Sequence, residues 1–134
     1  MVRKLIRLYF NNYSYSERVF KIGEATFSEV FKFELKDGSN HVVKIIPLDL
    51  ENNSPIDQYP LPININAAIH ECKVLQEISS LNTSDNWTGF TKVLEICVIQ
   101  GKYPVKLQNE WRHWLDTKGS ENSDPGKLCY HFRN

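Results

Sequence analysis

The stretch "KIGEATFSEVFKFELKDGSNHVVKIIPL" (21–48) decides the fold of this chain. Within 29–36, apolar side chains alternate with charged ones, which is the period-two pattern of a strand with one buried face. A shorter run at 18–22 precedes the first glycine. These two runs predict a pair of strands.

The quoted stretch continues into a third strand. "KDGSN" (36–40) contains the Asp-Gly pair that favours a tight turn. "HVVKIIPL" (41–48) then predicts a strand that Pro47 ends. We therefore predict a three-stranded antiparallel meander.

The segment "GEATFS" (23–28) between the first two strands has two interpretations. It is longer than a hairpin needs, which is about two to five turn residues, and it holds a glycine, an alanine and a serine along its length. It is either a plain surface hairpin or a lid over phosphate groups in which two glycines are replaced. The segment alone does not choose between them.

Loops and helices are predicted for the rest of the chain. In order these are a proline-containing loop at 49–66, a helix at about 66–81, a strand pair or a strand with a turn at 90–104, and a helix at 105–119. Asn64 or Asn66 is the expected N-cap of the first helix, and Gly119 is expected to end the second.

Composition and charge favour one globular domain. The chain has 134 residues, of which 41% are hydrophobic and 24% charged. Basic and acidic residues number 16 each, which argues against a general nucleic-acid or membrane-surface binder. The cysteines are three, far apart and without a C-x-x-C pair, so neither zinc nor a disulfide framework is expected.

Two charged residues occupy places where apolar ones are expected. Lys44 interrupts "VVKII", a run that otherwise predicts a fully buried strand. On a helix with about 100° per residue, Glu71 falls near the middle of an apolar face. The other members of that face are Ala67, Val74, Leu75 and Ile78. Because a lone buried carboxylate is costly unless paired, we expect Glu71 and Lys44 to face each other between sheet and helix.

Each charge alone has a simpler explanation. Lys44 can reach solvent from an edge strand, and Glu71 can flank the apolar face. Together, after a glycine-containing loop, they follow the order loop, strand, strand with lysine, helix with glutamate. That is the order of a protein-kinase N-lobe, where the lysine contacts nucleotide phosphates and the glutamate holds the lysine.

Beyond this order, the chain resembles the haspin family of divergent Ser/Thr kinases, which phosphorylate a threonine in a histone tail. "KIGEATFSEVF" resembles that family's Gly-rich loop, "VVKIIPL" its lysine strand and "HECKVLQEISSL" its C-type helix. The most specific piece is "GKYPVKLQNEWRHWLDTKGSENSDP" (101–125), which resembles the family's Q-G-x-Y-P segment, Trp-bearing helix and T-K-G-S-x-N loop. The resemblance covers roughly 18–126. It implies an α+β, kinase-like N-lobe with an antiparallel sheet, a C-type helix and haspin-like insertions.

The resemblance also implies an ATP site, with ATP and Mg²⁺ as cofactors. The implied ATP-binding residues are Ile22, Gly23, Ala25, Phe27, Ser28, Val30, Val42 and Lys44, with Glu71 as the partner of the lysine. Gly23, Ala25 and Ser28 take the three glycine places. Ala25, Ser28 and Val42 add side-chain bulk there and beside the adenine, so weakened nucleotide binding is expected.

The motifs that carry kinase chemistry are missing from the sequence. It has no H-R-D-like run with a following asparagine, and no D-F-G or D-Y-T. We therefore expect no complete catalytic set, no protein-held metal and no C-lobe. The expected organisation is an N-terminal extension at 1–17, an N-lobe at 18–126 and a truncated tail at 127–134 in place of the hinge strand.

Three functions remain open. The first is a fragment of a haspin-like Ser/Thr kinase, inactive by itself, whose complete form acts on a histone tail or chromatin protein in the nucleus, on chromosomes or in the cytoplasm. The second is a catalytically dead binding or regulatory module whose exposed apolar floor self-associates or takes a covering partner. The third is an unrelated α+β domain with an accidental kinase pattern. No direct nucleic-acid or membrane partner is expected.

The remaining candidates favour packing over chemistry. Trp111 and Trp114 are three apart on a predicted helix and are expected to pack in the core. His113 and His131 have no companions at metal-ligand spacing, and Cys72 is expected to be a small packing residue.

Overall fold

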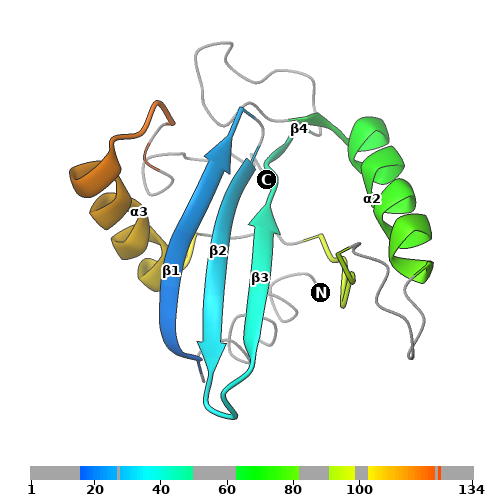
Figure 1. Cartoon of the computed structure of the whole chain (residues 1–134). Coiled ribbons are helices and arrows are strands. Elements are labelled where there is room, and N and C mark those ends of the chain that lie inside the picture. The colour runs from blue at the N-terminus through cyan, green and yellow to red at the C-terminus, as the bar shows by residue number, and fades with distance from the viewer. Residues whose placement is uncertain are drawn as a thin grey trace, which may run out of the picture.

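The computed structural model describes residues 16–26, 28–49, 63–81, 91–98, 103–122 and 124. They form an α+β fold with a three-stranded antiparallel sheet, a short parallel pair of strands and two helices (Figure 1). In chain order the elements are β1 (Ser16–Ala25), β2 (Ser28–Leu35), β3 (Asn40–Ile45), β4 (Leu48–Asp49), β5 (Ile63–Asn64), α2 (Ile65–Ser80) and α3 (Val105–Lys118). The predictions for 1–15, 50–62, 82–90 and 125–134 lie outside the described residues.

The predicted meander is confirmed, because β2 pairs with both β1 and β3 in the order β1-β2-β3. The turn between β2 and β3 is made by Asp37 and Gly38, as the Asp-Gly signal predicts. Gly38 has φ of 84°, a left-handed conformation that glycine adopts without a Cβ clash. The Asp37 carboxylate accepts hydrogen bonds from the Ser39 hydroxyl at 2.6 Å and the Ser39 amide at 2.8 Å. These bonds, led by the hydroxyl, lower the pKa of Asp37.

The hairpin between β1 and β2 is tighter than predicted. β1 runs to Ala25 and β2 begins at Ser28, and these two residues are partners in the ladder. The expected long loop at 23–28 is therefore mostly strand. Gly23 and Glu24 belong to the ladder because pairing to β2 satisfies their backbone groups.

The β1–β2 ladder has two irregularities, one between Ser16 and Arg18 and one nearer the hairpin tip, between Lys21 and Gly23. Lys21 pairs with Phe31 and Gly23 pairs with Val30, so Ile22 is left without a partner in β2. Such a bulge shifts the alternation of side chains by one residue. Lys21 and Glu24, three residues apart, consequently project from the same face of the sheet, whereas an unbroken strand would place them on opposite faces.

The core lies on one face of the sheet. It consists of Val19, Phe31 and Phe33 from the strands and Leu107 from α3. Tyr103 packs against this cluster, with its ring centroid 6.3 Å from that of Phe31. The predicted alternation in β2 is confirmed, since Phe31 and Phe33 are buried while Lys32 between them is not.

α3 covers this face from the side of β1 (Figure 1). It begins after Pro104 and buries Leu107 and Trp111, one turn apart. The helix ends at Gly119, as predicted, and the Gly119 amide donates to the Leu115 carbonyl at 3.0 Å. Gly119 has φ of 75° and ψ of 156°, a conformation essentially restricted to glycine, and it redirects the chain toward the β1–β2 hairpin.

α2 lies beyond β3, past the opposite edge of the sheet from α3 (Figure 1). Of the two predicted N-caps the structure has Asn64, whose Oδ1 accepts a hydrogen bond from the Ala67 amide at 2.9 Å. No residue of α2 is buried. The predicted apolar face is therefore largely open to solvent, and Val74 and Leu75 are both exposed.

The prediction of strands at 90–104 is wrong for the part that the structure describes. Residues 91–98 form neither strand nor helix, and α3 already begins at Val105. The alternating apolar residues that suggested a strand, among them Leu94 and Val98, are exposed. The Val93 amide donates to the Ser79 hydroxyl at 2.8 Å, so the segment is held to the end of α2 rather than to a sheet edge.

Neither described helix is long and apolar enough to cross a membrane.

Candidate nucleotide-binding site

The ion pair between Lys44 and Glu71 is the centre of the candidate site. The Lys44 ammonium on β3 donates to Glu71 Oε1 on α2 at 2.7 Å. The contact confirms that the two charges face each other. The expected burial is wrong, because the side chains are 46% and 38% exposed. α2 contacts the separate short pair β4 and β5 more than the three-stranded sheet, and water reaches both charges.

The sheet register places the other candidates on the same face as Lys44. Val30 pairs with Lys44 on one side and with Gly23 on the other, and residues directly opposite in a ladder share a face. Val42, two residues before Lys44, also projects from this face. The core residues occupy the opposite face. The candidate site is thus the sheet face opposite the core and α3, bordered by the helix that carries Glu71.

Part of this face is exposed. Val42 is 64% exposed and Ile22 is also exposed. Ile22 is the bulge residue and does not face Val30 across the ladder, as a simple pairing would require. Near the hairpin tip Ala25 is exposed, whereas Ser28 opposite it is buried. Phe27 lies outside the described residues.

Lys32 of β2 is a second lysine on this face, and it is paired with Glu34. Lys32 bonds Glu34 Oε1 at 3.0 Å, and Arg18 bonds Glu34 Oε2 at 2.9 Å. The hydrogen bond from Lys32, assisted by the charge of Arg18, lowers the pKa of Glu34. Both lysines are thus paired with a glutamate, and Lys44 is the one whose partner lies on the helix that borders this face.

A buried cluster of charges escaped the sequence reasoning. Lys21 and Glu29 are almost completely buried on the α3 side of the sheet, and Lys21 also pairs with Glu24. Regular strand alternation would place Lys21 and Glu24, three residues apart, on opposite faces, so it does not predict this pair. The available signal was indirect. Ser120 and Asn122, which bond to Glu24 and Glu29, belong to the T-K-G-S-x-N run at 117–122.

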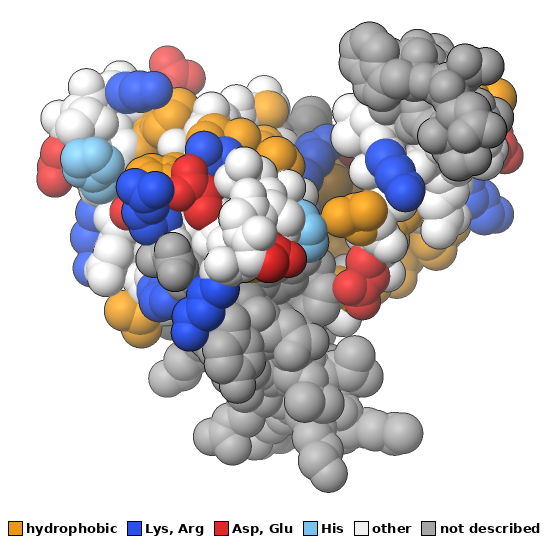
Figure 2. All heavy atoms as spheres, turned by 60° about the horizontal axis from the view of Figure 1, so that its bottom comes forward, with side chains coloured by type: hydrophobic (Ala, Val, Ile, Leu, Met, Phe, Trp, Pro, Cys, Tyr) orange, Lys and Arg blue, Asp and Glu red, His pale blue; other side chains and the backbone are white. Residues whose placement is uncertain are grey.

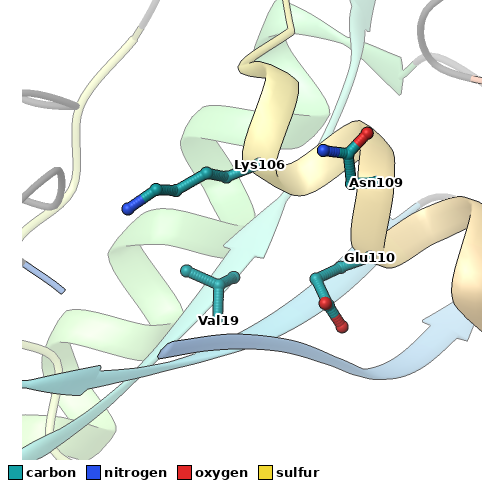
Figure 3. Close-up of a pocket in the computed structure, with 4 residues that line it drawn as sticks. All are labelled: Val19, Lys106, Asn109 and Glu110. Carbon is teal, nitrogen blue, oxygen red and sulfur yellow. The ribbon is translucent and has the colours of Figure 1, made fainter. Parts of the chain in front are cut away.

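A small hollow of about 170 Å³ lies elsewhere on the molecule. It is lined by Val19 of β1 and by Lys106, Asn109 and Glu110 of α3 (Figure 3). Val19 belongs to the core face, so this hollow is on the opposite side of the sheet from Lys44. It is not part of the candidate nucleotide site.

The other candidates occupy structural positions. Trp111 is buried in the core, as predicted, while Trp114 is partly buried and contacts two lysines. Cys72 is partly buried on α2 and His113 is exposed on α3, whereas His131 lies outside the described residues. Across the described ranges, no three His, Cys, Asp or Glu side chains are grouped so that they could hold a metal ion.

The sheet, the strand lysine and the helix glutamate together give an α+β fold consistent with the N-lobe of a protein kinase. No protein-family model matches the chain. It is 31% identical over 113 residues to the serine/threonine-protein kinase haspin homolog of Drosophila melanogaster, covering 78% of this chain and 19% of that protein. It is 32% identical over 105 residues to the haspin homolog of Schizosaccharomyces pombe, covering 78% and 18% respectively.

Serine/threonine-protein kinase haspin of Mus musculus is 32% identical over 114 residues, which cover 81% of this chain and 14% of the mouse protein. The chain belongs to the haspin family. It spans less than a fifth of the length of these three relatives.

Proposed function

We propose that this chain supplies the nucleotide-holding part of a haspin-like serine/threonine kinase. The observation that carries the proposal is the 2.7 Å pair between Lys44 and Glu71, on the sheet face that also bears Gly23 and Val30. In protein kinases a lysine so placed contacts the ATP phosphates, and the glutamate fixes its position. The half-exposed pair fits that role, because the Lys44 ammonium is accessible to a ligand while its hydrogen bond to Glu71 fixes its orientation.

Each proposed residue has a defined task. Lys44 binds the phosphates and Glu71 orients it. Ile22, Val30 and Val42 provide apolar surface for the adenine, and the backbone around Gly23 and Ala25 lies over the phosphates together with Phe27 and Ser28. ATP supplies the phosphoryl group. Because the described residues offer no carboxylate cluster for a metal, Mg²⁺ would enter bound to the nucleotide.

The substrate and setting follow from the family. We propose that the whole kinase transfers the ATP γ-phosphate to a threonine of a histone tail and acts in the nucleus on chromosomes. This chain alone is proposed to be inactive, because its sequence has no catalytic-loop aspartate and no metal-binding D-F-G or D-Y-T. Those groups position the substrate hydroxyl and the metal ions in kinases.

Nucleotide binding is the first test. Isothermal titration with ATP–Mg²⁺ should give a weak but measurable affinity for the wild type and a loss of about tenfold or more in Lys44→Met. Lys73→Met on the exposed side of α2 is the matched control, since it removes the same charge outside the site. Equal affinities in the wild type and both variants would contradict the proposal.

Phosphate transfer is the second test. Incubation with labelled ATP, Mg²⁺ and a histone-tail peptide should give no transfer above the level of Lys44→Met. Transfer well above that variant would show that this chain is an active kinase, which contradicts the inactivity part of the proposal but not its nucleotide site.

The second candidate function, a binding module, is favoured by the apolar surface that the described residues leave uncovered. Exposed apolar side chains occur on the sheet face at Ile22 and Val42, on α2 at Ile69 and Val74, and at Leu94. On the face shown in Figure 2, such side chains are interspersed with charged ones. A covering partner or a second copy would bury them. Light scattering of the purified chain distinguishes self-association from a monomer.

A further inference from the structure

The bulge at Ile22 gathers three charged side chains on the α3 side of the hairpin. Glu24 and Glu29 are partners in the ladder, one pair below the hairpin tip. Two carboxylates directly opposite each other repel. Because of the bulge, Lys21 projects from the same face and forms ion pairs with both Glu24 and Glu29. The Lys21–Glu29 contact measures 2.8 Å between Nζ and Oε2.

Two of the three side chains are enclosed by protein, while Glu24 is 21% exposed. The side chain of Lys21 is 1% exposed and that of Glu29 is 3% exposed. The indole of Trp114 on α3 lies beneath the Lys21 ammonium, whose Nζ is 4.7 Å from the ring centroid. The ammonium is thus held by two carboxylates and an aromatic face, which together compensate its removal from water.

The segment after α3, residues 119–122, contacts both glutamates of the cluster. The Ser120 hydroxyl donates to Glu24 Oε2 at 2.8 Å, and the Asn122 side-chain amide donates to Glu29 Oε1 at 2.9 Å. The Asn122 backbone amide donates to the Ser120 hydroxyl at 3.1 Å, which ties the two contacts together. One bond therefore reaches β1 and the other reaches β2, on either side of the hairpin tip. Gly119, with its positive φ, turns the chain into this position.

We propose that Ser120 and Asn122 act as positioning residues that clamp the β1–β2 hairpin, and that this clamp determines how well the hairpin holds a nucleotide. The inference rests on the proposed function of the opposite sheet face. A glycine-rich lid adapts to phosphates through its flexible backbone. Here Ala25 and Ser28 replace two of the glycines, and the hairpin is fixed from behind by charge-assisted hydrogen bonds. The hairpin is thereby preorganised by the segment that follows α3.

The test is the double variant Ser120→Ala/Asn122→Ala in the full chain, compared with the wild type by amide hydrogen exchange. We expect exchange at 22–30 to accelerate about tenfold or more, because two hydrogen bonds to carboxylates are lost. Amides of β3 should keep their rates. Titration with ATP–Mg²⁺ should show an affinity about threefold to tenfold weaker, because the competent hairpin conformation is less populated. Ser120→Thr, which keeps the hydroxyl, should restore most of the Ser120 contribution.

The matched control is Asn109→Ala/Thr117→Ala, which removes one amide and one hydroxyl from α3 without touching the hairpin. Unchanged exchange at 22–30 in the clamp variant, or equal acceleration in the control, overturns the clamp. Faster exchange with unchanged ATP affinity overturns its link to the nucleotide. If the wild type binds no ATP–Mg²⁺, the proposed function fails, and the exchange rates still decide whether the hairpin is clamped.

Discussion

Replacing Lys21 by Met should destabilise the chain far more than replacing Lys44 by Met, although both lysines lie at hydrogen-bond distance from a glutamate. The distances are 2.8 Å for Lys21–Glu29 and 2.7 Å for Lys44–Glu71. What differs is burial, since the Lys44–Glu71 pair is roughly half exposed and the Lys21–Glu29 pair is enclosed. At a separation of about 4 Å, unit charges interact by about 1 kcal/mol in water and about 4 kcal/mol at an effective dielectric constant of about 20.

The expected costs follow from what each substitution leaves behind. Lys21→Met leaves Glu29 buried without its counter-charge and should lower the free energy of unfolding by about 3–5 kcal/mol. Lys44→Met leaves Glu71 in contact with water and should cost at most about 1 kcal/mol. A double-mutant cycle of Lys44→Met with Glu71→Leu should accordingly give a coupling energy of about 0.2–1 kcal/mol.

Urea unfolding followed by tryptophan fluorescence measures these differences, since the indoles of Trp111 and Trp114 lie in or next to the core. Methionine keeps the length and most of the apolar stem of lysine, so the comparison isolates the charge. Equal costs for the two lysine substitutions would refute the reasoning from burial. A coupling energy of several kcal/mol between Lys44 and Glu71 would show that their environment is much drier than the described structure indicates.

Three further outcomes are expected. Leu107→Ala should lower the free energy of unfolding by about 2–5 kcal/mol, because Leu107 is almost fully buried between α3 and the sheet; a loss comparable to that of the exposed Leu115→Ala would contradict the placement of the core. Gly119→Ala should cost about 1–3 kcal/mol by thermal or urea unfolding through backbone strain alone, since a Cβ at this position meets no other atom; a neutral effect would mean that the chain leaves α3 differently. The purified chain should bind a fluorescent hydrophobic dye, and Val42→Lys should reduce the signal; a monodisperse chain without dye binding would argue against an open sheet face.

The sequence was most informative where a local rule fixes the structure. Alternation in β2 identified the buried Phe31 and Phe33, the Asp-Gly pair located the second turn, and Gly119 marked the end of α3. The pairing of Lys44 with Glu71 was also predictable, because two opposite charges at positions that favour apolar residues are expected to pair with each other. Each of these inferences uses a regularity that extends over only a few residues.

The errors arose where a neighbour distant in sequence decides the outcome. Gly23, Ala25 and Ser28 are paired in the β1–β2 ladder, although composition predicts a loop for 23–28. Residues 91–98 have the pattern of a strand but do not join a sheet, and no local signal distinguishes the two cases. The burial of Lys21 depends on a bulge and on Ser120 and Asn122, which are about a hundred residues away along the chain.

The bulge also makes Ile22 a position in β1 where the chain tolerates a change of length. Deleting Ile22 would leave Lys21 opposite Phe31 and Gly23 opposite Val30, so every side chain would keep its face in a ladder that is then regular from Arg18 to Ala25. Deleting a neighbouring paired residue would instead turn the rest of the strand over and exchange its two faces. Related hairpins that differ by one residue at this position can therefore be structurally equivalent, whereas hairpins of equal length with the bulge elsewhere would not be.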